Sequence, residues 1–194
     1  LFNSMERPFN LYDRGLREYT YCCGFNPNAI PTNGVVLNVG GGMYQKFERE
    51  LQRVRPDVRS ITLDPSVNPN ASVFSLDSGK ILTSDQKATR IQYISSWTIV
   101  AFGQHIPLPP QSVDVVLDVY GAAHYISDYH ELTTYFREVH RILKPKGGIF
   151  RIASVMHFPV NDVIRALINS NLCIHDQTDG QEGSYLATLA RSDL

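Results

Sequence analysis

The chain has 194 residues, of which 43% are hydrophobic and 19% charged, and its formal net charge is −1. This length suits a single domain, over residues 1–194, with a full hydrophobic core. The near-neutral charge argues against a general binder of nucleic acids or membrane surfaces, because such proteins carry a basic excess. We therefore expect one globular domain with no membrane association and no general affinity for nucleic acid.

The sequence also indicates the cellular compartment of the protein. No apolar run approaches the roughly 20 residues that span a bilayer, and the polar start, with Glu6 and Arg7, does not resemble a signal peptide. Cys22 and Cys23 are adjacent, a spacing that suits neither a disulfide framework nor a zinc site. Cys173 lies in an apolar stretch and is expected in the core. We expect a cytoplasmic protein without a bound metal; the oligomeric state is not readable from the sequence.

Residues 1–34 are rich in aromatic side chains. A helix is predicted from about Leu11 to Cys22, ended by Gly24 and the following Asn26-Pro27 turn. This segment has two interpretations. It is either a helix packed on the edge of the core, or a lid whose tyrosines line a substrate cleft.

The segment around which the chain is organised is Val35–Val39 followed by Gly40, Gly41 and Gly42. A short apolar run that breaks into glycines predicts a buried strand and a tight turn, because glycine adopts backbone angles closed to other residues. An amphipathic helix follows, and its apolar stripe is Tyr44, Phe47, Leu51 and Val54. Its Lys and Arg residues are expected to face solvent. Strand, glycine turn and helix together are typical of nucleotide-binding α/β domains.

The next predicted strand, residues 59–64, ends on Asp64, 22 residues after Gly42. In doubly wound nucleotide-binding folds, an acid at this spacing accepts hydrogen bonds from the ribose hydroxyls. The alternative is an aspartate that caps a helix or turn. The combination of turn, helix and acid favours ligand binding.

The rest of the chain alternates between predicted strands and helices. A loop is expected over 68–79, and helices over 84–95, around 132–143 and around 160–168; strands are expected over 98–102, 113–119, 149–155, 172–175 and 185–190. This alternation predicts a doubly wound α/β fold. Its seven-stranded, mostly parallel, Rossmann-like sheet has helices on both faces and an antiparallel C-terminal strand pair.

Two segments carry a resemblance to a known family. Residues 106–116 read IPLPPQSVDVV and residues 136–148 read FREVHRILKPKGG. They resemble the "LPF…SFDVV" and "ExxRVLKPGG" segments of class I S-adenosylmethionine-dependent methyltransferases of the methyltransferase type 11 kind. The similarity runs from about Val35 to Val155, and the predicted closing strand pair fits the same family.

The resemblance implies a set of cofactor-binding residues. Asn38 and the glycine turn would lie against the methionine part of S-adenosylmethionine, Asp64 with Pro65 would hold the ribose, and the backbone around Gly103 and Gln104 would face the adenine. Asp118 and the residues after it would line the floor of the transfer site. In sequence order, the implied cofactor-binding residues are Asn38, Gly40, Gly41, Gly42, Asp64, Pro65, Gly103, Gln104 and Asp118.

Methyl transfer from a sulfonium is an in-line displacement, so the protein chiefly aligns the donor and the acceptor. A general base assists when the acceptor is a hydroxyl or a protonated amine. His124 is the first candidate, since imidazole titrates near neutral pH, and Tyr125 or Tyr120 would orient the acceptor. The alternative for His124 is a hydrogen-bonded loop histidine. A small-molecule acceptor is favoured by elimination, since the sequence carries no motif for nucleic-acid or glutamine amino groups.

The chain departs from the family pattern at three positions. Asn38 replaces an acid, Tyr44 stands where the third glycine falls, and Phe102 replaces the acid before the adenine loop. These departures favour an alternative function, a methyltransferase-like protein that binds a partner and does not catalyse. A nicotinamide dehydrogenase fits less well, because its fingerprint requires glycine at the position of Gln45.

Overall fold

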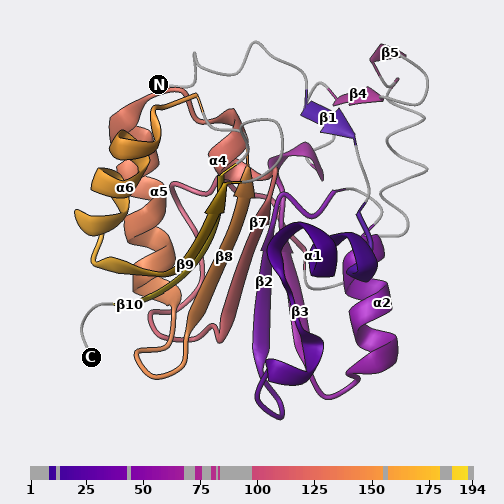
Figure 1. Ribbon diagram of the computed structural model, residues 1–194. Coiled ribbons are helices and arrows are strands. Elements are labelled where there is room, and N and C mark those ends of the chain that lie inside the picture. The colour runs from indigo at the N-terminus through magenta and orange to yellow at the C-terminus, as the bar shows by residue number, and fades with distance from the viewer. Residues whose placement is uncertain are drawn as a thin grey trace.

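The structure of this protein, a computed structural model, describes residues 9–11, 14–42, 45–67, 73–75, 80–81, 83, 98–154, 157–179 and 185–191. Its centre is a seven-stranded sheet in the order β6-β3-β2-β7-β8-β10-β9 (Figure 1). The strands are β2 (Val35–Val39), β3 (Arg59–Leu63), β6 (Thr98–Ile99), β7 (Val115–Val119), β8 (Ile149–Ser154), β9 (Leu172–Asp179) and β10 (Tyr185–Arg191). The pairs from β6 to β8 are parallel, and β10 is antiparallel to both β8 and β9. The predicted fold class is confirmed.

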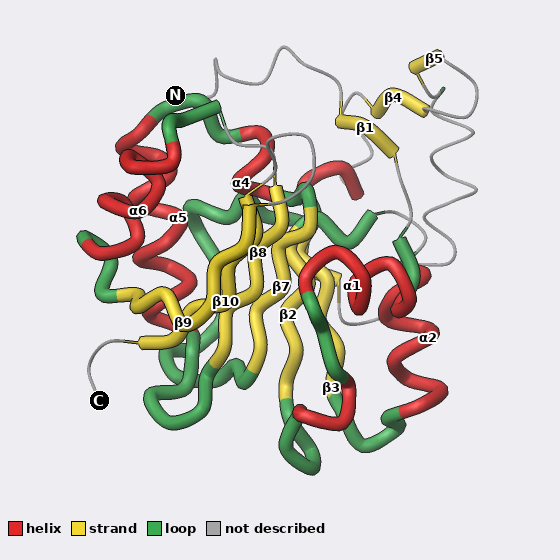
Figure 2. Tube along the Cα trace, in the orientation of Figure 1, coloured by secondary structure: helices red, strands yellow, loops and turns green. Residues whose placement is uncertain are grey.

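Helices cover both faces of the sheet, as the side-chain alternation of the strands requires. Leu37 and Val116 pack with helices α5 (Tyr129–Ile142) and α6 (Val160–Ile168), whereas Val36 and Leu117 pack with α1 (Leu16–Cys23) and α2 (Lys46–Val54). Figure 2 shows the two pairs of helices on opposite sides of the sheet. Among the described residues, no helix has the length and apolar character needed to cross a bilayer.

Several predicted elements differ from those observed. The N-terminal helix begins at Leu16, later than predicted, because β1 (Phe9–Leu11) pairs in parallel with β4 (Val73–Ser75). β4 also pairs with β5 (Lys80–Ile81), so part of the predicted 68–79 loop belongs to a small second sheet. Cross-strand pairing over such distances leaves no periodic signal in segments of two or three residues.

Two predicted core positions are wrong. Val54 is 55% exposed and Cys173 is exposed on β9, whereas Glu48 is buried on the face of α2 that was expected to be apolar. Periodicity marks which residues share a face, but contacts at the end of a helix decide which of them are covered. Tyr44 and the predicted 84–95 helix lie outside the described residues.

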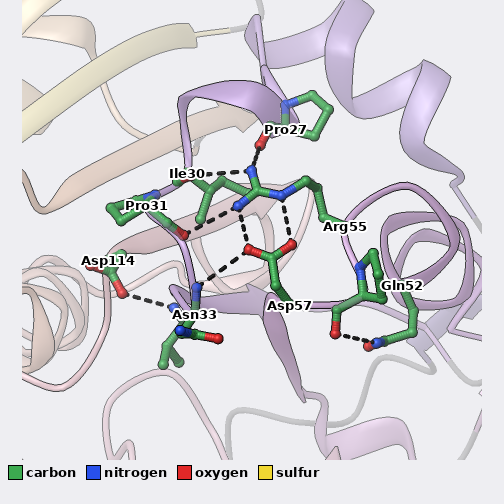
Figure 3. Close-up of polar contacts among 10 residues, drawn as sticks. Pro27, Ile30, Pro31, Asn33, Gln52, Arg55, Asp57 and Asp114 are labelled. Carbon is green, nitrogen blue, oxygen red and sulfur yellow. Dashed lines mark hydrogen bonds and ion pairs between the residues drawn. The ribbon is translucent and has the colours of Figure 1, made fainter.

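Arg55 ends α2 and ties it to the segment that leads into β2 (Figure 3). Its guanidinium donates to the carbonyls of Pro27, Ile30 and Pro31, and it makes a two-pronged contact with the carboxylate of Asp57. A planar guanidinium matches several acceptors at once in this way. Arg55 was expected to be a solvated helix residue, but it fixes the turn that positions β2.

The first prediction concerns the core between α5 and the sheet. Phe136 is fully buried, with its ring 6.1 Å from that of Phe150. Phe136→Ala is expected to lower the free energy of unfolding by about 3–5 kcal/mol, because the cavity cannot fully collapse. Arg137→Ala, the exposed neighbour on the same helix, is the control and should change it by less than about 0.5 kcal/mol in urea denaturation. Equal losses in both variants would contradict the assigned core.

The second prediction concerns pH. The Arg55 guanidinium lowers the pKa of Asp57 from 3.8 to about 2. Because this pKa is lower in the folded state, the pair stabilises the fold above about pH 4, and the contribution is lost as the pH falls towards 2. Asp57→Asn should therefore have a lower melting temperature than the native chain at pH 6 but a smaller difference at pH 2.5. A difference that does not depend on pH would show that Asp57 acts only through neutral hydrogen bonds.

Candidate functional site

The candidate site lies where the carboxyl ends of β2, β3 and β7 meet. From β2 the chain moves outward to β3 and β6, and then returns to place β7 on the other side of β2. The strand order reverses at this point, and open α/β sheets bind ligands in the crevice beyond the strand ends there. The predicted glycine turn, Asp64 and the loop after β7 all follow strands that end at this edge.

The glycine turn is held in shape by contacts within the protein. Gly40 has φ of 75°, and a β-carbon on it would lie 2.5 Å from Cα of Gly121 in the loop after β7. A β-carbon on Gly41 would lie 2.7 Å from Nδ2 of Asn38 and 2.8 Å from Oε1 of Glu48. Gly40 and Gly41 are therefore required by packing, whatever they contribute to a ligand.

Asp64 is joined directly to this turn. Its carboxylate accepts hydrogen bonds from the backbone N–H of Gly42, at 2.8 Å to Oδ2, and from that of Ser66, at 2.8 Å to Oδ1. The residue is only 5% exposed, and burial raises its pKa. Pro65 follows in the short helix η2 (Pro65–Val67), which continues the turn after the strand. The glycine turn and the acid thus form one hydrogen-bonded unit.

A buried polar network of Tyr19, Asn38, Glu48 and Thr62 lies beneath the turn, and the sequence analysis had assigned only Asn38 to the site. Tyr19 of α1 donates to Oδ1 of Asn38 at 2.7 Å, and Nδ2 of Asn38 donates to Oε1 of Glu48 at 2.7 Å. Thr62 of β3 also donates to that Glu48 oxygen, at 2.5 Å. Burial raises the pKa of Tyr19 well above its usual range, and the negative charge of Glu48 raises it further. The position of Glu48 between Phe47 and Leu51, on the buried side of α2, is the feature of the sequence that could have indicated its burial.

Asp118 of β7 organises the loop that follows the strand. Its carboxylate accepts from the backbone N–H of Gly121 at 2.8 Å, from that of Ala123 at 3.0 Å, and from the hydroxyl of Tyr135 at 2.7 Å. The side chain is fully buried, and this burial raises its pKa. Asp118 therefore shapes the floor of the site through the loop. Its carboxylate points towards the loop and the Tyr135 hydroxyl, which supply these three hydrogen bonds.

The predicted catalytic side chains lie together after β7. Ring centroids are 5.9 Å apart for Tyr120 and His124, and 5.1 Å apart for His124 and Tyr125. Tyr120 has φ of 54°, and the Arg14 guanidinium lies 4.7 Å from its ring centroid. His157, which follows β8, adds a second imidazole 6.2 Å from that of His124. Part of this segment, Ala122–Tyr125, is the short helix α4 rather than the expected loop.

Gly103 and Gln104 reach the same neighbourhood from the loop after β6. A β-carbon on Gly103 would lie 2.8 Å from Cβ of Ala122 in α4 and 2.6 Å from the Tyr135 ring. Gln104 donates to Glu131 of α5 at 3.4 Å. This backbone is therefore fixed against α4 and α5. The structure brings the predicted site residues together along one edge of the sheet.

The arrangement at Asp64 fits a nucleoside cofactor. A carboxylate offers about four lone-pair positions, and the backbone N–H groups of Gly42 and Ser66 together with the Ser66 side chain use three of them. Acceptor capacity remains for one ribose hydroxyl. Within the described residues, no group of three or more His, Cys, Asp and Glu side chains is placed to hold a metal ion.

Comparisons with known proteins agree with this geometry. A family model described as "Methyltransferase domain" matches residues 63–151. No curated protein sequence gave a significant match. Among solved structures, a TehB-like SAM-dependent methyltransferase from Corynebacterium glutamicum is 11% identical with a TM-score of 0.60, over 90% of this chain and 93% of that one. The PH0226 protein from Pyrococcus horikoshii is 15% identical with a TM-score of 0.57, over 81% and 82%.

A third similar structure is CalO1, a methyltransferase in calicheamicin biosynthesis, in its SAH-bound form. It is 10% identical with a TM-score of 0.56, over 89% of this chain and 52% of that one. At sequence identities this low, the structural similarity establishes the fold alone. Together, the family match over residues 63–151, the strand order and the edge where glycine turn and acid meet support a class I S-adenosylmethionine-dependent methyltransferase core. The same findings support S-adenosylmethionine as the cofactor.

The third prediction tests Asp64. Asp64→Ala is expected to reduce affinity for S-adenosylmethionine at least tenfold, because the ribose hydroxyls lose a charged acceptor. The free energy of unfolding should also fall, by about 1–3 kcal/mol, since the buried N–H groups of Gly42 and Ser66 lose their partner. Calorimetry and urea denaturation measure the two effects separately. An unchanged affinity would show that Asp64 is only a turn residue.

Proposed function

We propose that this protein is an S-adenosylmethionine-dependent methyltransferase that acts on a small-molecule acceptor. The observation that carries the proposal is the hydrogen bond between the Gly42 N–H and the Asp64 carboxylate, which joins the two elements that we propose to bind the cofactor. Bound there, the cofactor supplies a methyl group already activated by its sulfonium. We further propose that residues 1–194 form one domain and that the protein is cytoplasmic.

The chain itself has to align the acceptor and accept a proton. His124 is the proposed base, because it is half-buried between two tyrosine rings and lies on the loop that contacts the glycine turn through Gly121. Histidine is the side chain most often used as a general base in proteins. Tyr120 and Tyr125 are proposed to orient the acceptor.

The N-terminal segment contributes to this arrangement. Arg14 donates to the Val119 carbonyl at 3.3 Å and holds the Tyr120 ring from one side. A guanidinium over an aromatic face stabilises the ring in one orientation. Tyr120 also occupies a left-handed backbone conformation, which costs free energy for a residue with a side chain. Such strain is more common at functional sites than elsewhere, and it supports a role for Tyr120 in the acceptor site.

The fourth prediction tests the function by titration calorimetry with S-adenosylmethionine and, separately, S-adenosylhomocysteine. We expect dissociation constants in the micromolar range, or about −8 kcal/mol. His124→Ala should bind both ligands as the native chain does, because His124 is assigned to the acceptor. No heat and no thermal shift with either ligand would overturn the proposal and favour the non-catalytic alternative, a methyltransferase-like protein that binds a partner.

A further inference from the structure

Helices α1 and α2 lie side by side (Figure 1), and a groove runs between them on the surface of the molecule. The groove has a volume of about 870 Å³. Leu16 and Tyr21 of α1 and Val54 of α2 form its apolar walls, and Arg17 and Arg53 also line it. None of these side chains belongs to the candidate cofactor site or acceptor site. We call this surface the α1–α2 groove.

The apolar walls of the α1–α2 groove are open to solvent. Tyr21 is 83% exposed and Val54 is 55% exposed. The two helices are held together on their inner side, where the buried rings of Tyr19 and Phe47 lie 4.3 Å apart. A small-molecule site buries most of the ligand and of its own walls. Walls as exposed as these instead suit a larger occupant, a segment of another protein that covers them.

The groove also carries a surplus of positive charge. Arg17 and Arg53 are exposed, and among the described residues neither guanidinium makes a hydrogen bond or an ion pair. Glu50, which lines the groove, accepts from the backbone N–H of Leu16 at 2.7 Å, where its charge complements the N-terminus of α1. Glu18 accepts from the backbone N–H of the residue before α1, at 2.9 Å. The acids therefore hold α1 in place, and the two guanidiniums are available to the carboxylates of a partner.

We propose that the α1–α2 groove is a docking surface for an acidic, amphipathic segment of a partner protein. An apolar side chain of the segment packs between Tyr21 and Val54, and its carboxylates pair with Arg17 and Arg53. Tyrosine and arginine are among the residues that contribute most to binding at protein interfaces. The eight residues of α1 span about 12 Å, which matches about two turns of a helical segment laid along the groove.

Charge separates this partner from two others. A second copy of the chain, related by a twofold axis, would bring the arginines of both copies to one interface, where like charges are unfavourable. A nucleic acid is bound through several basic side chains that contact its phosphates. This groove instead has two arginines beside apolar walls, in a chain with a net charge of −1. Docking here requires no bound cofactor, so it is independent of the proposed function.

The fifth prediction uses as its probe a fluorescein-labelled helical peptide of about twelve residues, with leucines along one face and glutamates elsewhere. Fluorescence anisotropy with the native chain is expected to give a dissociation constant below about 100 μM. Arg17→Glu with Arg53→Glu should weaken binding at least about tenfold, because attractive charge pairs become repulsive. Arg137→Glu with Arg165→Glu reverses two exposed arginines on the opposite face of the sheet, and this control should stay within about twofold of the native affinity.

Further comparisons separate charge from apolar contact. Tyr21→Ser should weaken binding of the same peptide by about fivefold or more, whereas Ile168→Ser, at a 63% exposed position on α6, should not. A peptide with lysine in place of every glutamate should bind the native chain at least about tenfold more weakly. Hydrogen exchange should be slowed by the acidic peptide in α1 and α2. Melting curves confirm that each variant is folded.

Several results would overturn the proposal. The first is no detectable binding of the acidic peptide, and the second is an equal loss of affinity in the two double arginine variants. If the native chain sediments as a dimer that Tyr21→Ser converts to a monomer, the groove is an interface between copies. If a short DNA duplex binds more tightly than the peptide and depends on Arg17 and Arg53, the groove binds nucleic acid. None of these results bears on S-adenosylmethionine binding, which calorimetry measures separately.

Discussion

The shape of the candidate site depends on the hydrogen bond between the Asn38 amide and the Glu48 carboxylate, at 2.7 Å. It joins β2 to α2 across the glycine turn, and through Tyr19 and Thr62 it extends to α1 and β3. All four side chains are polar, and water is largely excluded from them, so each depends on the others for its hydrogen bonds. The network therefore holds the first turn of α2 against the ends of β2 and β3.

The close approach of two loops depends on that geometry. Gly40 and Gly121 meet backbone to backbone because neither has a side chain, and a β-carbon on Gly121 would lie 2.1 Å from the Val39 carbonyl oxygen. The glycines thereby place the loop that carries His124 directly beside the turn that follows β2. Donor and acceptor sites in a methyltransferase must adjoin, and here backbone packing brings together the two segments that we propose for these roles.

The two buried aspartates at this edge differ in the segments of the chain that they hold by hydrogen bonds. Burial raises the pKa of both Asp64 and Asp118, so neither is an ordinary surface acid. Asp118 accepts three bonds from the protein and holds the loop after β7. Asp64 accepts from the backbone N–H groups of Gly42 and Ser66 and from the Ser66 side chain, and holds the glycine turn against the end of β3. Aspartates at the ends of two parallel strands thus hold different segments: Asp118 holds the loop after β7, and Asp64 joins the glycine turn to the start of η2.

The sequence by itself determined the strand and helix alternation, the glycine turn, the acid after β3 and the helix through Phe136, because each depends on local periodicity or on backbone freedom at glycine. It did not determine the small β1–β4–β5 sheet, the exposure of Val54 and Cys173, or the role of Arg55, since these depend on which distant segments come into contact. Glu48 is the clearest case. Its burial and its hydrogen bond to Asn38 exist only once α2 packs against the ends of β2 and β3, because a side chain's charge acquires its environment from the tertiary structure.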